Sequence, residues 1–186
     1  MSYLSYTKNL DHNLLMFLLR DSERYMPIVA FFDQVTRNLS ELSWMEAEMI
    51  AKEISKENRS EFCSGIRAGV VNALGCPPTL LESEKFQAAV AFALKVDKDA
   101  RAITANHIQL VLDAGWSEQT VEDIVGIVAI QRLYNTIATG LGFKGMPEQV
   151  FADIGQDTVE KGAMLPLFAL LSISLKGELR GVLDKS

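Results

Sequence analysis

The stretch Leu42–Val70, LSWMEAEMIAKEISKENRSEFCSGIRAGV, is predicted to form two helices joined by a short turn. Ser43, with Glu46 three residues later, has the pattern of a capping box, which starts a helix. That helix is predicted to continue to about Asn58, and a second helix starts at Ser60. We therefore expect a helical hairpin, and this hairpin decides the fold.

The second helix of the hairpin has an equally clear end. Gly75 follows its last turn and Pro77-Pro78 comes shortly after, which is a strong stop signal. A start at Ser60 places Cys63 at the third helical position. The hairpin therefore carries a cysteine in the first turn of its second helix.

Helical signals also cover most of the remaining chain. Apolar residues recur every three or four positions, between start and stop residues, in segments 25–35, 83–96, 104–115 and 117–140. Segment 117–140 is apolar on more than one face, which indicates a central place in the core or in a subunit interface. No segment keeps the period-2 alternation of a strand for long, so the predicted fold class is all-α.

The two ends of the chain carry weaker signals. Residues 146–162 are expected to form a short helix and loop, and the apolar tail after Ala163 to cover a neighbour or a pocket. The longest apolar run, Ala163–Leu175, contains a proline and is shorter than the roughly 20 residues that span a bilayer. The N-terminal residues lack the pattern of a secretory signal. These features predict a cytoplasmic protein with no membrane partner.

Chain length, net charge and histidine spacing limit the number of domains and the kinds of partner and cofactor. A chain of 186 residues fits one domain over residues 1–186. Its net charge of −6 argues against a nucleic-acid partner, which would require a basic patch. The two histidines, His12 and His107, have no metal-ligand spacing around them, so neither a metal nor a cofactor is expected.

Cys63 is the first candidate for chemistry. At the start of a helix, unpaired backbone N–H groups and the positive end of the helix dipole favour a thiolate. Arg67, one turn further on the same face, would favour it as well. The alternative is that Cys63 is a small buried core residue and Arg67 a surface charge. Cys76, at the end of this helix, lies roughly 20 Å from Cys63 at 1.5 Å per residue, too far for a disulfide within one subunit.

Glu48 is the second candidate, on the first helix of the hairpin. Across the hairpin it could pair with Arg67, or it could be a solvated charge of the helix surface. Gln131 and Asn135 interrupt an otherwise apolar helix. They could line a pocket or be core amides with satisfied hydrogen bonds.

Three stretches together resemble a known family. Tyr25–Asn38, Leu42–Val70 and Phe86–Gly142 are similar to the carboxymuconolactone decarboxylase-like family and, within it, to the AhpD-like alkylhydroperoxidases and peroxidase-related proteins. The resemblance covers residues 25–142 and leaves 143–186 as a C-terminal extension. It implies an AhpD-like helical bundle, with the hairpin carrying the cysteine motif.

The resemblance also assigns roles to residues of the hairpin. Peroxidatic members of the family have a Cys-x-x-Cys motif at the start of the second helix, a histidine four residues after it, and a glutamate on the preceding helix. Cys63 matches the cysteine that attacks peroxide, and Glu48 matches the glutamate. Ser60 stands in place of the resolving cysteine and Arg67 in place of the histidine. The resemblance thus implies an altered cysteine centre.

Two functions follow from the resemblance. One is an AhpD-like oxidoreductase, a one-cysteine peroxidase or thiol-dependent antioxidant protein with Cys63 as nucleophile and an external thiol as donor. Arg67 would then stabilise the thiolate, Ser60 would cap the helix and bond the sulfur, and Glu48 would orient Arg67. This role requires a thiol pKa well below ~8.5.

The other function is a non-peroxidatic member of the same family. Such a protein would bind or convert a small ligand without thiol chemistry, as the absence of the second cysteine and the histidine suggests. Either function implies a small-molecule substrate. The resemblance and the apolar segment 117–140 also imply a homo-oligomer.

Overall fold

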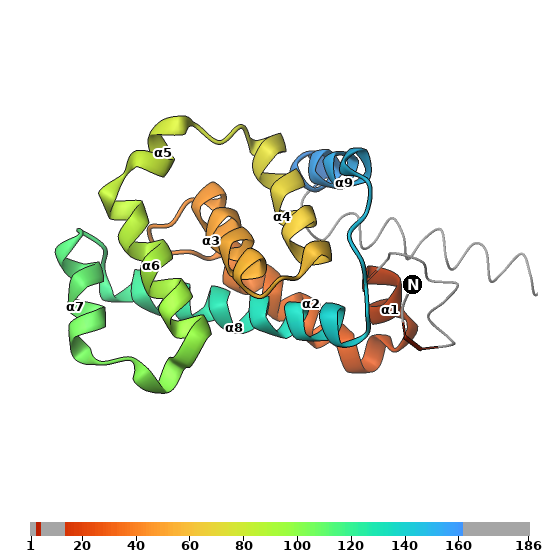
Figure 1. Ribbon diagram of the computed structural model, residues 1–186, viewed down its shortest axis with the longest axis horizontal. Helices are drawn as coiled ribbons and strands as arrows, with labels where there is room; N and C mark the ends of the chain where they lie inside the picture. The colour runs from red at the N-terminus through yellow and green to blue at the C-terminus, as the bar shows by residue number, and fades with distance from the viewer. Residues whose placement is uncertain (1–2, 5–13, 162–186) are drawn as a thin grey trace, which may run out of the picture.

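The computed structural model describes residues 3–4 and 14–161, and these contain no strand. The helices are α1 (Leu14–Arg20), α2 (Ser22–Arg37), α3 (Trp44–Glu57), α4 (Glu61–Leu74), α5 (Pro78–Glu82), α6 (Glu84–Asp99), α7 (Ala105–Asp113), α8 (Glu118–Gly140) and α9 (Glu148–Lys161), with a 3₁₀ turn at Ala100–Ala102 (Figure 1). The prediction of an all-α fold is confirmed. The predicted role of the apolar tail after Ala163 concerns residues outside the described part.

The helical hairpin is formed by α3 and α4, as predicted. Ser43 Oγ accepts a hydrogen bond from Glu46 N at 3.2 Å, and the Glu46 carboxylate accepts one from Ser43 N at 2.7 Å. The predicted capping box is therefore confirmed. At the other end of the hairpin, Gly75 stops α4 with a φ of 73°, a left-handed conformation that favours glycine.

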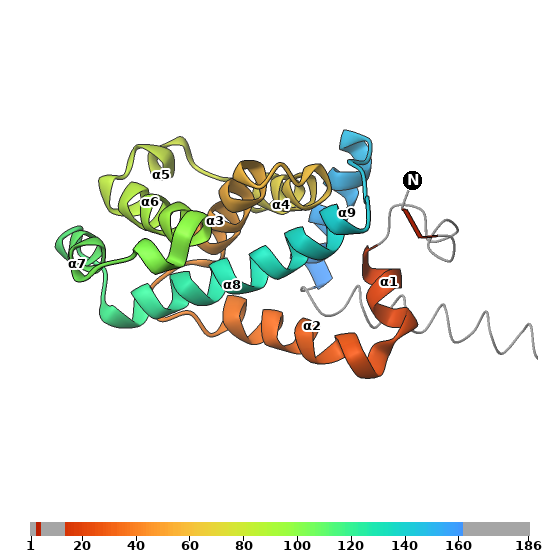
Figure 2. The same ribbon diagram turned by 60° about the horizontal axis from the view of Figure 1, so that its bottom comes forward.

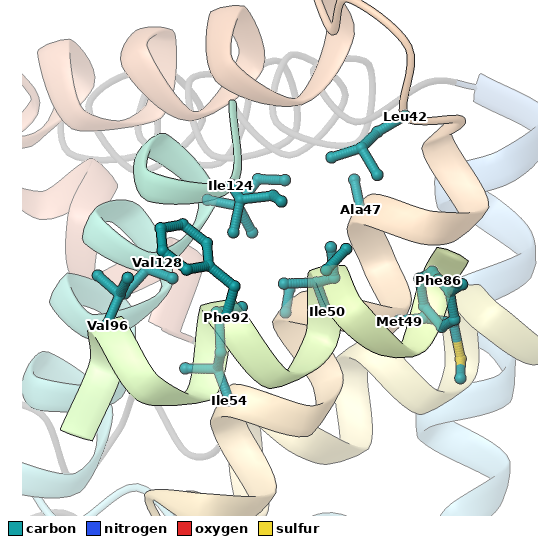
Figure 3. Packing of buried hydrophobic residues seen from close by; sticks show 14 of the residues in the cluster. Leu42, Ala47, Met49, Ile50, Ile54, Phe86, Phe92, Val96, Ile124 and Val128 are labelled. Carbon is teal, nitrogen blue, oxygen red and sulfur yellow. The ribbon is translucent and has the colours of Figure 1, made fainter. Parts of the chain in front are cut away.

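The core confirms the central position predicted for the helix over 117–140. α8 packs against α2 on one side and against α3 and α6 on the other (Figure 2). Ile50 of α3, Phe92 of α6 and Ile124 of α8 meet in this core (Figure 3). Burying each of these side chains stabilises the fold by about 1.5–3 kcal/mol.

α2 is longer than the segment 25–35 predicted for it. Asp21 caps it by accepting a hydrogen bond from Arg24 N, and the helix continues to Arg37. Phe31, which the sequence pattern assigns to the apolar face, is 52 % exposed. Phe32, which the same pattern assigns to the apolar face, does face α8, and its ring packs on Tyr134.

The region after α8 contains a full helix, α9, where the sequence suggested a short helix and a loop. α9 lies along α4 (Figure 1). Its Gly155 meets the backbone of Gly69, and its Phe151 covers Gly65 and Gly69. The two backbones come this close because these positions have no side chains. None of the described helices is long and apolar enough to cross a membrane.

Candidate functional site

Two of the predicted site residues form an ion pair inside the hairpin. Arg67 Nη1 of α4 donates to Glu48 Oε1 and Oε2 of α3, at 3.2 and 3.1 Å. The Glu48 side chain is 3 % exposed and the Arg67 side chain 11 %. The predicted pairing is therefore present, and neither residue is a solvated surface charge.

Further hydrogen bonds hold both members of this pair. Trp44 Nε1 donates to Glu48 Oε1 at 3.2 Å, and Arg67 Nε donates to Gln131 Oε1 at 3.1 Å. Gln131 Nε2 in turn donates to Ser55 Oγ at 2.7 Å and to Asn135 Oδ1 at 3.1 Å. Gln131 is thus a core amide with satisfied hydrogen bonds, one of the two alternatives left open by the sequence. The network fixes the guanidinium between α3, α4 and α8.

The aromatic side of the site comes from α2 and α8. The guanidinium of Arg67 lies over the Phe32 ring, 4.7 Å from its centroid. The Phe32 ring meets the Tyr134 ring edge-on, with centroids 5.6 Å apart. Sequence reasoning treated both aromatics as core residues only, since helical periodicity carries no signal of what a core residue faces.

Cys63 lies beside this network but in an apolar environment. It is 5 % exposed and packs in a cluster with Phe62, Ala138 and Phe143. Burial raises the pKa of its thiol, whereas the Ser60 hydroxyl and the Arg67 guanidinium lower it in part. The expectation of a thiol pKa well below the ordinary value is therefore wrong, because desolvation outweighs both groups.

Ser60 is at the N-cap of α4, but its side chain does not cap the helix. Its Oγ is buried and has no hydrogen-bond partner among the described residues. The predicted capping role is therefore wrong. Its Oγ also makes no hydrogen bond to the Cys63 sulfur, so the expected bond is absent, although the nearby hydroxyl dipole lowers the thiol pKa in part.

Tyr134 is the ionisable group of the site that sequence reasoning missed. It is half-buried and packs against the cluster that contains Cys63. Burial raises the pKa of Tyr134 to about 12, while Arg67 opposes the rise and Cys63 adds to it. Cys63, Arg67 and Tyr134 are thus electrostatically coupled.

Among the described residues, no group of three or more histidine, cysteine or acidic side chains could hold a metal ion.

The raised thiol pKa predicts how Cys63 reacts with an alkylating agent. In a Cys76→Ala variant, the iodoacetamide reaction of Cys63 should rise with pH to an apparent pKa above ~8.5, since only the thiolate reacts. Mass spectrometry of the alkylated chain gives the rate at each pH. The same chain unfolded in urea is the control and should titrate near ~8.5. A folded-state value at or below that of the unfolded chain would contradict the prediction.

Comparison with known proteins supports the fold of this chain and leaves its activity open. No family model matches the sequence, and no curated protein does. An uncharacterized peroxidase-related protein from Silicibacter sp. TM1040 superposes with a TM-score of 0.67 at 20 % identity, over 75 % of this chain and 78 % of that one. The alkylhydroperoxidase AhpD core of an uncharacterized peroxidase-related protein from Ralstonia eutropha JMP134 gives a TM-score of 0.63 at 21 % identity, with the same coverage. The chain therefore has the AhpD-like helical fold, as the resemblance of its sequence implied.

Proposed function

We propose that this protein is a one-cysteine AhpD-like oxidoreductase, in which Cys63 reduces a small hydroperoxide and an external thiol regenerates it. The observation that carries the proposal is the grouping at the start of α4. There the Ser60 hydroxyl and the Arg67 guanidinium both act to lower the pKa of the Cys63 thiol against its burial. Both groups favour the thiolate, which is the reactive form, and they limit the rise in the thiol pKa that burial causes.

The proposed cycle has three steps. After the thiol loses its proton, the Cys63 sulfur attacks one peroxide oxygen, so that an S–O bond forms and the O–O bond breaks. The sulfur is oxidised by two electrons to a sulfenic acid, and the second oxygen takes up a proton and leaves as an alcohol. An external thiol then gives a mixed disulfide and water, and a second thiol molecule releases Cys63 together with the disulfide of the external thiol.

The external thiol is needed because the chain has no internal partner for Cys63. Its only other cysteine is Cys76, which follows Gly75 at the opposite end of α4. The helix separates the two residues by roughly 20 Å at 1.5 Å per residue, and a disulfide requires Cα atoms within about 7 Å.

Peroxide consumption by the purified protein tests the proposal. We expect turnover that requires both peroxide and added thiol and that disappears in Cys63→Ala. The rate of turnover should rise about tenfold per pH unit below the thiol pKa, because the fraction of Cys63 present as thiolate rises by the same factor. Cys76→Ala is the matched control and should retain the wild-type rate. Equal consumption by wild type and Cys63→Ala would contradict the proposal.

The second candidate is a non-peroxidatic protein that binds or converts a small ligand without thiol chemistry. It is favoured by the raised pKa of Cys63 and by the bonds that already tie Arg67 to Glu48 and Gln131. Absence of thiol-dependent peroxide consumption up to the pH at which the fold is lost would favour this function.

Self-association is part of the proposal. Val125 and Leu133 lie on the outer side of α8 and are 42 % and 37 % exposed. We propose a homo-oligomer in which these exposed aliphatic side chains of α8 are covered.

A further inference from the structure

Cleavage of a hydroperoxide by Cys63 requires an acid. When the O–O bond breaks, the departing oxygen carries a negative charge and is as basic as an alkoxide. A positioned acid that protonates it in the transition state typically accelerates such a step by ~10²–10⁴-fold. The inference below rests on the proposed function and asks which side chain supplies this proton.

Three polar groups near Cys63 are unsuited to the task. The guanidinium of Arg67 stays protonated in proteins and donates hydrogen bonds without releasing a proton. Both oxygens of Glu48 accept hydrogen bonds from Arg67, and Oε1 accepts a further one from Trp44. Both carboxylate oxygens of Glu48 are therefore already engaged as hydrogen-bond acceptors. The Ser60 hydroxyl is an aliphatic alcohol and no stronger an acid than the alcohol that leaves.

Tyr134 has the remaining acidic proton, and its ring is held in place from several sides. It packs edge-on against Phe32, whose ring also lies under the Arg67 guanidinium. On α8, the residues at 131 and 135 are buried in the hydrogen-bond network of the site. The Tyr134 side chain packs against the buried cluster that contains Cys63, and its phenol is near enough for the charge of Cys63 to act on its pKa.

We propose that Tyr134 is the catalytic acid that protonates the leaving oxygen when Cys63 cleaves a hydroperoxide. The Cys63 thiolate forms the S–O bond, the O–O bond breaks, and the phenol proton moves to the departing oxygen. The products are the sulfenic acid, a neutral alcohol and a tyrosinate. The tyrosinate regains its proton from solvent, and this replaces the proton that the thiol released before the attack.

The acidity of Tyr134 fits this role. A pKa of about 12 keeps the phenol protonated at neutral pH. It is still a far stronger acid than water, whose pKa is ~15.7, or than an aliphatic alcohol. Arg67 lowers the pKa of both Tyr134 and Cys63, so that one cation stabilises the thiolate before the step and the tyrosinate after it.

A Tyr134→Phe variant tests the inference, because it removes the hydroxyl and keeps the ring. Oxidation of Cys63 should be measured in single turnover with three reagents. With an alkyl hydroperoxide, which leaves as an alkoxide, we expect a rate loss of about 10²-fold. With peracetic acid, which leaves as acetate, and with iodoacetamide, which leaves as iodide, the departing group needs no proton. Those two rates should change less than about threefold.

Tyr25→Phe is the matched control, since Tyr25 is another half-buried tyrosine that packs against the same cluster, on Phe17. It should leave all three rates at the wild-type level. An equal loss with all three reagents in Tyr134→Phe would mean that Tyr134 only shapes the site, and would overturn the inference. So would an unchanged rate with the alkyl hydroperoxide. Failure of wild type to reduce any peroxide would overturn the proposed function, and the inference with it.

Discussion

Replacing Arg67 with methionine should lower the free energy of unfolding by about 3–5 kcal/mol, the largest stability effect expected for this chain. Methionine replaces the apolar stem of arginine with a shorter uncharged chain and leaves Glu48, which is 3 % exposed, as a buried charge without its ion-pair partner. Gln131 Oε1 also loses the hydrogen bond that it accepts from Arg67. Urea denaturation followed by circular dichroism measures the loss.

Two further variants separate the ion pair from other causes. Arg101→Met removes an exposed arginine, 95 % accessible, whose pair with Asp99 is at the surface. Its effect should stay within about 0.5 kcal/mol. Adding Glu48→Met to Arg67→Met should restore more than half of the loss, because the unpaired charge is then gone. A loss below about 1 kcal/mol in Arg67→Met would show that Glu48 is not held by this pair.

Replacing Gly69 with alanine should separate α9 from α4. A Cβ at position 69 would overlap the carbonyl of Phe151, which is backbone and cannot rotate away. Gly155 of α9 also packs on the backbone of Gly69, so the whole of α9 must shift. We expect a cost of about 1–3 kcal/mol, together with faster amide hydrogen exchange along α9.

The control for this substitution is a second helical glycine. A Cβ at Gly140, at the end of α8, would meet nothing within 4 Å. Gly140→Ala should therefore stabilise the protein by about 0.5–1 kcal/mol, because alanine loses less backbone entropy in a helix. The two changes should thus act with opposite signs. Wild-type stability and exchange in Gly69→Ala would disprove the close packing of α9 on α4.

Several features of the fold could be predicted from the sequence because their causes are local. The capping box at Ser43 and the left-handed stop at Gly75 depend on a few neighbouring residues. Together they predicted the hairpin, which in turn brings Glu48 opposite Arg67. The small residues of α9 were harder to interpret, since glycine weakens a helix unless another backbone packs against it.

The sequence by itself determined an all-helical chain and a cysteine at the start of the second hairpin helix. Only the tertiary structure decided the state of that cysteine. The pKa of Cys63 rises because segments remote in sequence, including Ala138 and Phe143, enclose it and remove water. Desolvation sums over all neighbours in space, so spacing along one helix could not give its sign. For the same reason Gln131 and Tyr134 became part of the site only when α8 packed against the hairpin.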